Sequence, residues 1–429
     1  MKKLLMLGTS NISCHIVEYA KSRGIYTIVT DYLEPERSVA KLIADEYWMI
    51  NTANVDELEV KCREEGVTAV ISGILSFNIE KGMELARRLQ LPYYCTKEAW
   101  DLTGDVDKAL FKKICLENGA AVATDYFLTD NPTDEELDSV HFPVVVKPVD
   151  GKANVGVSFC YNKEDLRKAF ELVHKVSENP KMVVEKLIKG EEWYSSYAIV
   201  NGQVRFLALN AMYWEPGYPT NCYTITTTVS NHIEQFLEEI NPQIETVLKK
   251  IGCTNGYAWV QVMRDEETGK FVVIESGYRF DGDMMFMPIK DITGYDSVKA
   301  MVDYHCGLES EGNPLPPPQK HAFTKCGCGH MFWTKKAGTI SKVEGVDEIK
   351  KLIPGVYVEC RRRPGDTFDA YRPLGTITYT AKDCEEFCKY IDIVNKTIKI
   401  FDETGEDVII KYTNFDYLKK VYQEGLEGK

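Results

Sequence analysis

Short apolar runs alternate with amphipathic stretches over the first ninety residues, and this alternation restricts the fold more than any other feature. The runs that predict strands are residues 3–7, 26–30, 47–50, 68–71 and 91–94. The stretches that predict helices end near Arg23 or cover 37–44, 55–65 and 78–89. Strands that alternate with helices pair in parallel, because each crossover returns the chain to the same edge of the sheet. Residues 1–105 are therefore predicted to form a doubly wound parallel α/β domain.

A dinucleotide site is one reading of this domain, because Gly8-Thr9-Ser10 follows the first predicted strand and Asp31 ends the second. The turn has a single glycine, however, where the dinucleotide fingerprint needs three for close approach of a pyrophosphate. The missing glycines therefore argue against a nicotinamide oxidoreductase built on residues 1–95. The domain is expected to serve as a scaffold or as part of a substrate site.

Length and charge limit the remaining classes. A chain of 429 residues is too long for one core and predicts two to four domains. A net charge of −14 argues against binding nucleic acid through phosphate neutralisation, and no apolar run approaches a membrane-spanning length. The cysteines number 13, an odd count, and are scattered, which favours reduced thiols in a cytoplasmic protein. Cys326-Gly-Cys328-Gly-His330 lacks a second metal-binding pair and is expected to be buried at the entry to a strand.

Residues 257–283 predict a β-hairpin that ends in charged residues. Two β-rich runs, Tyr257–Met263 and Phe271–Ile274, flank the turn sequence DEETG. Strict alternation would place Gln261 with Trp259 and Met263 on one face, and Glu275 with Phe271 and Val273 on another. Arg279, Asp281 and Asp283 follow. Carboxylate and amide oxygens beside an arginine suit a Mg²⁺-bound phosphate, although a surface hairpin with a solvated turn explains the same pattern.

Three further segments combine basic residues, glycines and acids. The helix predicted from DVDKALFKKICLENG has Asp105 as its expected N-cap, Lys108 in its first turn and an apolar stripe of Leu110, Phe111, Ile114 and Cys115. The strand Val144–Val146 delivers Lys147 before the loop 151–156, in which glycines could let backbone N–H groups converge on phosphate oxygens. A strand near residues 182–184 leads into Glu185-Lys186-Leu187-Ile188 and then Glu192.

The order of these residues along the chain resembles the ATP-grasp superfamily of carboxylate–amine and carboxylate–thiol ligases. Similar patterns occur in L-amino acid ligases and in the carbamoyl phosphate synthetase large-subunit and biotin carboxylase type. The resemblance implies a mixed α/β and α+β multidomain fold. Its predicted parts are an N-terminal α/β domain at 1–105, an ATP-grasp domain at 106–307 with a flap subdomain at about 112–185, a proline-rich linker at 308–320 and a C-terminal α+β domain at 321–429.

The resemblance also implies roles for individual residues. Lys108 and Lys147 match the two basic residues that hold the phosphates of ATP, and the loop with Gly151, Asn154 and Gly156 matches the flap over them. Glu185, Lys186 and Ile188 match the adenine-contacting segment, and Glu192 matches the ribose-binding acid. Gln261 and Glu275 match the Mg²⁺ ligands, where Mn²⁺ is an alternative cation. Arg279 and Lys147 are the implied catalytic residues, with Arg279 steadying an acyl phosphate.

One position departs from the family pattern, because Gly277 stands where most members carry Asn. The second cation would then be held less fully by protein, or with help from Asp281 or Asp283. The resemblance implies an ATP-dependent ligase that joins a small carboxylic or amino acid to an amine and releases ADP and phosphate. The alternatives are a nucleotide-binding module without ligation and a carboxylase-like enzyme. Tyr213, Trp214 and Tyr218 could border the acceptor pocket, and a homodimer is expected from the family.

Overall fold

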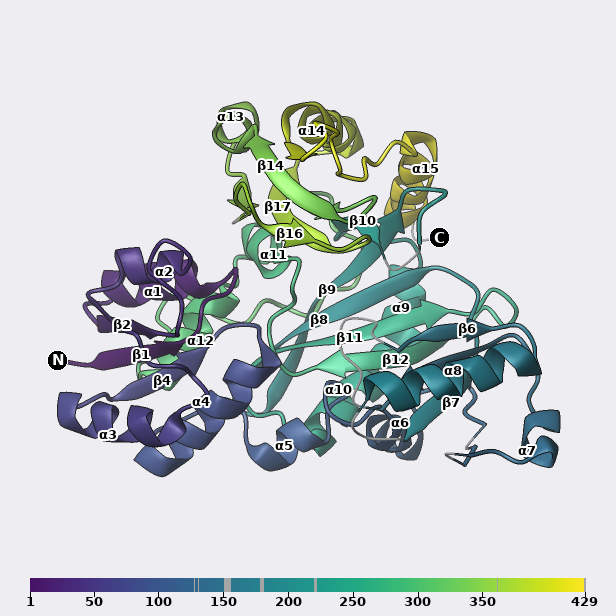
Figure 1. The fold of residues 1–429 in the computed structure, drawn as a ribbon, viewed down its shortest axis with the longest axis horizontal. Helices are drawn as coiled ribbons and strands as arrows, with labels where there is room; N and C mark the ends of the chain where they lie inside the picture. Colours follow the sequence, from purple (N-terminus) through teal and green to yellow (C-terminus); the bar gives the residue numbers. More distant parts are fainter. Residues whose placement is uncertain are drawn as a thin grey trace.

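The computed structural model describes the chain apart from residues 127, 130, 150–155, 178–180, 220–221, 361 and 428–429. It confirms the predicted mixed α/β multidomain fold. An N-terminal α/β unit, a small unit built from residues 108–186 and a C-terminal layer surround a large central sheet (Figure 1). None of the described helices is long and apolar enough to cross a membrane.

The N-terminal unit is a four-stranded parallel sheet, as predicted, in the order β3-β2-β1-β4. Its strands are β1 (Lys3–Leu7), β2 (Tyr26–Thr30), β3 (Glu46–Trp48) and β4 (Ala69–Ser72). Its helices are α1 (Ser13–Ser22), α2 (Val39–Ile43), α3 (Val55–Glu65) and α4 (Ser76–Leu89). The strand predicted at 91–94 is wrong. Tyr94 instead packs edge-on against Tyr278 and donates a hydrogen bond of 2.9 Å to its carbonyl oxygen.

Asp31, the acid that a dinucleotide site would use, is held by its own domain. The buried Lys41 lies 2.8 Å from one carboxylate oxygen, and the hydroxyl of Ser38 donates to the other at 2.7 Å. A ligand would have to displace both partners. Asp31 therefore stabilises its own domain, through Lys41 and Ser38, and its carboxylate is not available to a dinucleotide.

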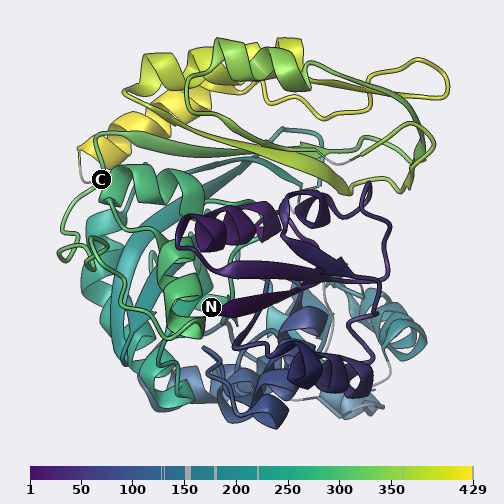
Figure 2. The ribbon, with the colours of Figure 1, turned by 90° about the vertical axis from the view of Figure 1, so that its left-hand side faces the viewer.

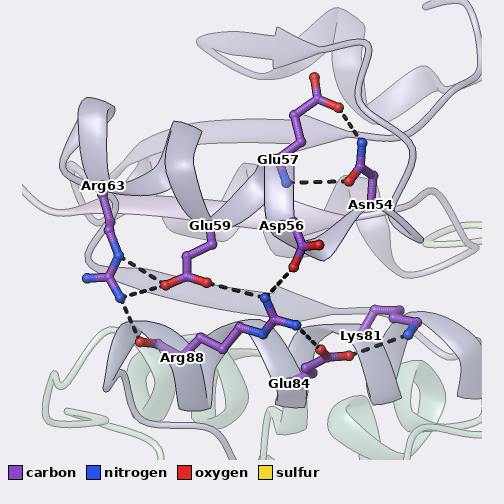
Figure 3. Close-up of polar contacts among 8 residues, drawn as sticks. All are labelled: Asn54, Asp56, Glu57, Glu59, Arg63, Lys81, Glu84 and Arg88. Carbon is purple, nitrogen blue, oxygen red and sulfur yellow. Dashed lines mark hydrogen bonds and ion pairs between the residues drawn. The ribbon is translucent and has the colours of Figure 1, made fainter.

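Ion pairs join α3 and α4 on the outer surface of the unit. Arg88 of α4 reaches Asp56 and Glu59 of α3, and it also pairs with Glu84 of its own helix (Figure 3). Asn54 caps α3 by accepting a hydrogen bond from the N–H of Glu57. These contacts lie away from the predicted phosphate site, and since their side chains are still reached by solvent, each pair contributes little to stability individually.

A second small unit lies beside the central sheet, at the lower right of Figure 1. Its elements are α6 (Lys108–Glu117), α7 (Asp134–Asp138), β5 (Val144–Pro148), β6 (Ser158–Cys160), α8 (Lys163–Val176) and β7 (Met182–Lys186), and α5 (Lys97–Asp101) precedes them. The strands form an antiparallel sheet in the order β6-β5-β7. Leu166, Phe170 and Val173 of α8 pack with Val144 and Val146, which fixes the strand that carries Lys147.

The central sheet has eight strands in the order β12-β11-β8-β9-β10-β13-β17-β15. They are β8 (Glu192–Val200), β9 (Gln203–Trp214), β10 (Tyr223–Thr227), β11 (Gly256–Arg264), β12 (Phe271–Gly277), β13 (Cys326–Trp333), β15 (Tyr357–Glu359) and β17 (Pro373–Ala381). The associated helices are α9 (Ile233–Glu239), α10 (Asn241–Ile251), α11 (Phe286–Thr293) and α12 (Ser297–His305). The predicted hairpin is present as β11 and β12.

Residues after the proline-rich segment 308–320 complete this sheet and cover one side of the molecule (Figure 2). β13 pairs with β10, so hydrogen bonds of one sheet cross the predicted domain boundary. The remaining elements are β14 (Gly338–Glu344), α13 (Val346–Leu352), β16 (Thr367–Phe368), α14 (Cys384–Thr397), β18 (Lys399–Asp402) and α15 (Phe415–Leu426). Neither α13 nor α15 was expected from the sequence. Cys326 and Cys328 are buried in β13, as predicted.

Candidate functional site

Gln261 and Glu275 lie directly opposite each other on β11 and β12. The ladder is irregular here, because Val262 pairs with Val273 while Gln261 pairs with Glu275, which leaves Ile274 as an extra residue. This bulge corrects the expectation that Glu275 shares a face with Val273. Directly opposed residues of an antiparallel pair project to the same face, so the bulge turns Glu275 toward Gln261. Strict alternation would have placed Ile274 there.

Lysines from the neighbouring small unit face this pair. The ammonium nitrogen of Lys108, in the first turn of α6, lies 3.1 Å from a carboxylate oxygen of Glu275. Lys147, at the end of β5, lies 3.5 Å from a carboxylate oxygen of Glu185. Burial lowers the pKa of Lys147. The negative charge of Glu275 opposes this shift, and the positive charge of Lys108 reinforces it. A bound anion would favour the charged lysines.

Lys112 is a third lysine at this site and was missed in the sequence. It is 4 % exposed and contacts the other carboxylate oxygen of Glu185, which is itself buried. Burial, followed by the nearby charge of Lys147, lowers the pKa of Lys112 well below its ordinary value. The sequence could have indicated this lysine, because Lys108 and Lys112 are four residues apart and therefore share a helix face.

The apolar stripe predicted for α6 is therefore partly wrong. The buried residues of this helix are Lys108, Phe111, Lys112 and Cys115, whereas Leu110 is 36 % exposed. The inward face of the helix carries two charges where the prediction placed only apolar side chains. Each of these two lysines has an acidic partner, Glu275 for Lys108 and Glu185 for Lys112. Such partners are needed because burying an unpaired charge is too costly.

Glu192 joins the same surface from β8. The amide nitrogen of Gln261 donates to a carboxylate oxygen of Glu192, so the predicted ribose-binding acid and the predicted metal ligand touch. Burial raises the pKa of Glu192, and the hydrogen bond from Gln261 opposes that shift. The donor nitrogen faces Glu192, which leaves the amide oxygen of Gln261 as the atom that could coordinate a cation.

Arg279 is held in place by Asp105 through two hydrogen bonds. The Nε and Nη2 groups donate to the two carboxylate oxygens at 2.7 and 3.0 Å. This contact corrects the predicted N-cap of α6, because Asp107 caps the helix and leaves Asp105 for the arginine. A bidentate pair fixes the plane of a guanidinium group. The positive charge therefore has a defined position near the end of β12.

The segment proposed to contact adenine also has defined partners. The backbone N–H of Lys186 donates to the carbonyl of Thr124 at 2.9 Å, and its ammonium group lies 2.5 Å from Glu267. Ile188 is buried with Ala123 and Val272. Of the predicted flap, Gly151 and Asn154 lie outside the described residues. Gly156 adopts φ +79°, a left-handed conformation that favours glycine.

Gly277 has no room for a side chain. A Cβ atom there would lie 2.5 Å from two carbons of the Trp259 indole, which is its cross-strand partner. Asp281 and Asp283, the suggested substitutes, are buried and occupied by other groups. The hydroxyl of Tyr257 donates to Asp281 at 2.6 Å, and that of Tyr194 donates to Asp283 at 2.8 Å. Burial raises the pKa of both carboxyls.

Tyr213 and Trp214 line one pocket together with Glu191, Glu192 and Tyr417 of α15. Tyr218 does not line it and packs beside Cys222 and Met331. Two of the three aromatic residues suggested for an acceptor pocket are thus next to Glu192.

These residues together bring oxygen donors and positive charges to one face of the sheet. Glu275 and the amide oxygen of Gln261 are the hard oxygen ligands that Mg²⁺ takes alongside phosphate oxygens, so the residues fit this cation. Lys108, Lys147 and Arg279 bring three basic side chains near these oxygen donors, and such groups can neutralise phosphate charge. Such an arrangement can bind a Mg²⁺–triphosphate and stabilise charge on a phosphoryl group during transfer.

Comparisons with known proteins show what the chain is similar to. Residues 140–286 match the family model described as an ATP-grasp domain. D-alanine–D-alanine ligase A of Bacillus cereus is 33 % identical over 164 residues, which cover 37 % of this chain and 52 % of that protein. The formate-dependent phosphoribosylglycinamide formyltransferase of Prochlorococcus marinus is 23 % identical over 189 residues, covering 44 % of this chain and 48 % of that protein. The chain thus spans about half the length of these curated relatives.

Solved structures resemble nearly the whole chain. An L-amino acid ligase from Bacillus licheniformis superposes with a TM-score of 0.73 at 18 % identity, covering 94 % of this chain and 99 % of that chain. The biotin carboxylase domain of a Hydrogenobacter thermophilus 2-oxoglutarate carboxylase, solved with MgADP, gives 0.74 at 19 % identity, covering 100 % and 95 %. At such identities the likeness concerns the fold. The chain has the ATP-grasp fold, and residues 140–286 match the model of the ATP-grasp domain.

Proposed function

We propose that this protein is an ATP-dependent carboxylate–amine ligase that forms a C–N bond and releases ADP and phosphate. The observation that carries the proposal is the opposed pair Gln261 and Glu275, with Lys108 and Arg279 beside it. The family match and the ligases among the relatives support it.

Each part of the site has a place in this reaction. Lys108, Lys147 and the flap with Gly151, Asn154 and Gly156 would hold the phosphates. Glu185, Lys186 and Ile188 would border the adenine, and Glu192 would bind the ribose. Mg²⁺ held by Glu275 and Gln261 would supply the charge that neutralises the γ-phosphoryl group.

The first step transfers the γ-phosphoryl group of ATP to an oxygen of the carboxylate, and the bond to the β-phosphate breaks to leave ADP. Arg279, fixed by Asp105, would stabilise the charge on the resulting acyl phosphate. The amine nitrogen then attacks the acyl carbon and loses a proton, and inorganic phosphate leaves with the former carboxylate oxygen. The acid is a small carboxylic or amino acid.

The test is ADP and phosphate release over a panel of amino acids supplied singly and in pairs. Release that requires both an acid and an amine, and that is lost in Glu275→Gln, supports the ligase. Binding of ATP without turnover over the panel would contradict it and would favour a nucleotide-binding module. The side chain missing at Gly277 is the observation that favours that second candidate.

A further inference from the structure

The face that carries Gln261 and Glu275 offers no further oxygen ligand at the next residue pair of the hairpin. The next pair on that face is Trp259 opposite Gly277. A Cβ atom on Gly277 would lie 2.5 Å from Cε2 and Cζ2 of the indole and 2.6 Å from Nε1. Ordinary carbon–carbon contacts are about 3.5–4.0 Å, so the indole occupies the space of any side chain at this position.

Position 277 offers no side-chain ligand beside Glu275, and no other carboxylate of the described residues supplies one. Asp281 and Asp283 are buried, with 5 % and 1 % of each residue exposed. Their carboxyl groups accept hydrogen bonds from buried hydroxyl groups. Glu192 is bonded to Gln261. In the part of the chain that the structure describes, no three acidic, histidine or cysteine residues are grouped to hold a metal ion.

A fixed positive charge lies beside the indole of Trp259. The guanidinium carbon of Arg279 lies 5.2 Å from the centroid of the Trp259 ring, within the range of a cation–π contact. The same group forms the bidentate pair with Asp105, which is buried. Trp259 therefore has two effects: it excludes a side chain at position 277 and it supports the arginine.

We propose that the site takes a single divalent cation with each nucleotide, bound at Glu275 and Gln261, because the indole of Trp259 leaves no room for a further ligand at position 277. This inference rests on the proposed function only in requiring that Mg²⁺–ATP binds at this pair. Mg²⁺ accepts one or two protein carboxylates and completes its shell with water and phosphate oxygens, so one cation needs no further ligand. A second cation would have to share Glu275 and would find no further ligand at position 277.

Counting Mn²⁺ tests the inference without measuring turnover. The protein is mixed with the β,γ-imido analogue of ATP at equal concentration, and free Mn²⁺ is measured by electron paramagnetic resonance as the ion is added. We expect binding to saturate at one ion for each bound analogue. Saturation at two ions would overturn the inference.

A variant supplies the reverse experiment. Trp259→Ala combined with Gly277→Asn opens the space and places an amide oxygen beside Glu275, and we expect it to bind a second Mn²⁺. Trp259→Ala alone is the matched control and should still bind one. A double variant that binds one ion would overturn the claim that the indole limits the site.

Failure of the proposed function can be told apart from failure of this inference. Binding of the analogue is followed separately by calorimetry. Protein that binds no analogue would overturn both, whereas analogue bound with two ions would overturn only the single-cation site.

Discussion

Replacing Gly277 with alanine should destabilise the protein because the new methyl group overlaps the indole of Trp259. Its Cβ atom would lie 2.5 Å from two ring carbons, about 1 Å inside an ordinary contact. The backbone of Gly277 is outside the left-handed region, so the cost is steric rather than conformational. Overpacking of this kind typically costs about 1–3 kcal/mol.

A double-mutant cycle isolates that overlap. In a Trp259→Ala background the indole is absent, so Gly277→Ala should be neutral or slightly stabilising, since alanine in a strand is favoured over glycine by roughly 0.5–1 kcal/mol. The free energies of unfolding, measured in urea, should therefore show a coupling of about 2 kcal/mol between the two positions.

Gly282→Ala is the matched control, because nothing lies within 4 Å of a Cβ atom there and its φ is not left-handed. If Gly277→Ala unfolds at the same urea concentration as Gly282→Ala, the proposed overlap is refuted. The single-cation inference would then lose its steric basis.

Three other variants test separate parts of the account. Glu275→Gln should abolish ADP production while the protein stays folded, and near-normal turnover would remove Glu275 from the metal site. Lys147→Ala should weaken binding of the ATP analogue by about 10- to 100-fold, the usual value of a charge-assisted hydrogen bond, and unchanged affinity would exclude this lysine. His305 is buried and burial lowers its pKa to about 4, so its neutral form stabilises the fold above pH 6.5 and that stability is lost as the pH falls toward 4. His305→Asn, which keeps a donor for the carbonyl of Met301, should therefore lose about 2 kcal/mol less than the parent between pH 7 and pH 5, and equal losses in urea titrations would contradict this.

The N-terminal unit was predictable because each of its elements has a local signal. Alternation of strands and helices gave the parallel sheet, and Gly66 ends α3 in a left-handed conformation. The error at 91–94 has a physical reason. Tyr93 and Tyr94 pack on the ring of His305, and the long-range partner that buries an apolar run cannot be read from the run itself.

The candidate site was predictable only where motif residues follow one another along the chain. The bulge at Ile274 depends on how the two strands pair, so a prediction from alternation alone assigned Glu275 to the wrong face. Lys112 could have been found from its spacing to Lys108. The pair between Asp105 and Arg279 joins residues 174 positions apart, and local reasoning assigned that aspartate to a helix cap instead.

The sequence also did not predict that the central sheet continues past residues 308–320. β13 and β17 have ordinary strand signals, but nothing in them specifies that β13 pairs with β10. α15 was missed although Asn414, a residue type that often starts helices, directly precedes it; in the structure its side chain makes no capping hydrogen bond. Its Tyr417 hydroxyl donates to Glu191 at 2.9 Å, next to the proposed ribose-binding acid.

The central claim is that Gln261 and Glu275 hold the cation of a bound triphosphate. Anomalous scattering from crystals grown with Mn²⁺ and the β,γ-imido analogue of ATP tests it directly. We expect one manganese peak within coordination distance of Glu275, about 2.1 Å for a Mg²⁺-like ion, with Lys108 and Lys147 on the phosphates. Manganese bound elsewhere, with both side chains turned away from it, would contradict the account.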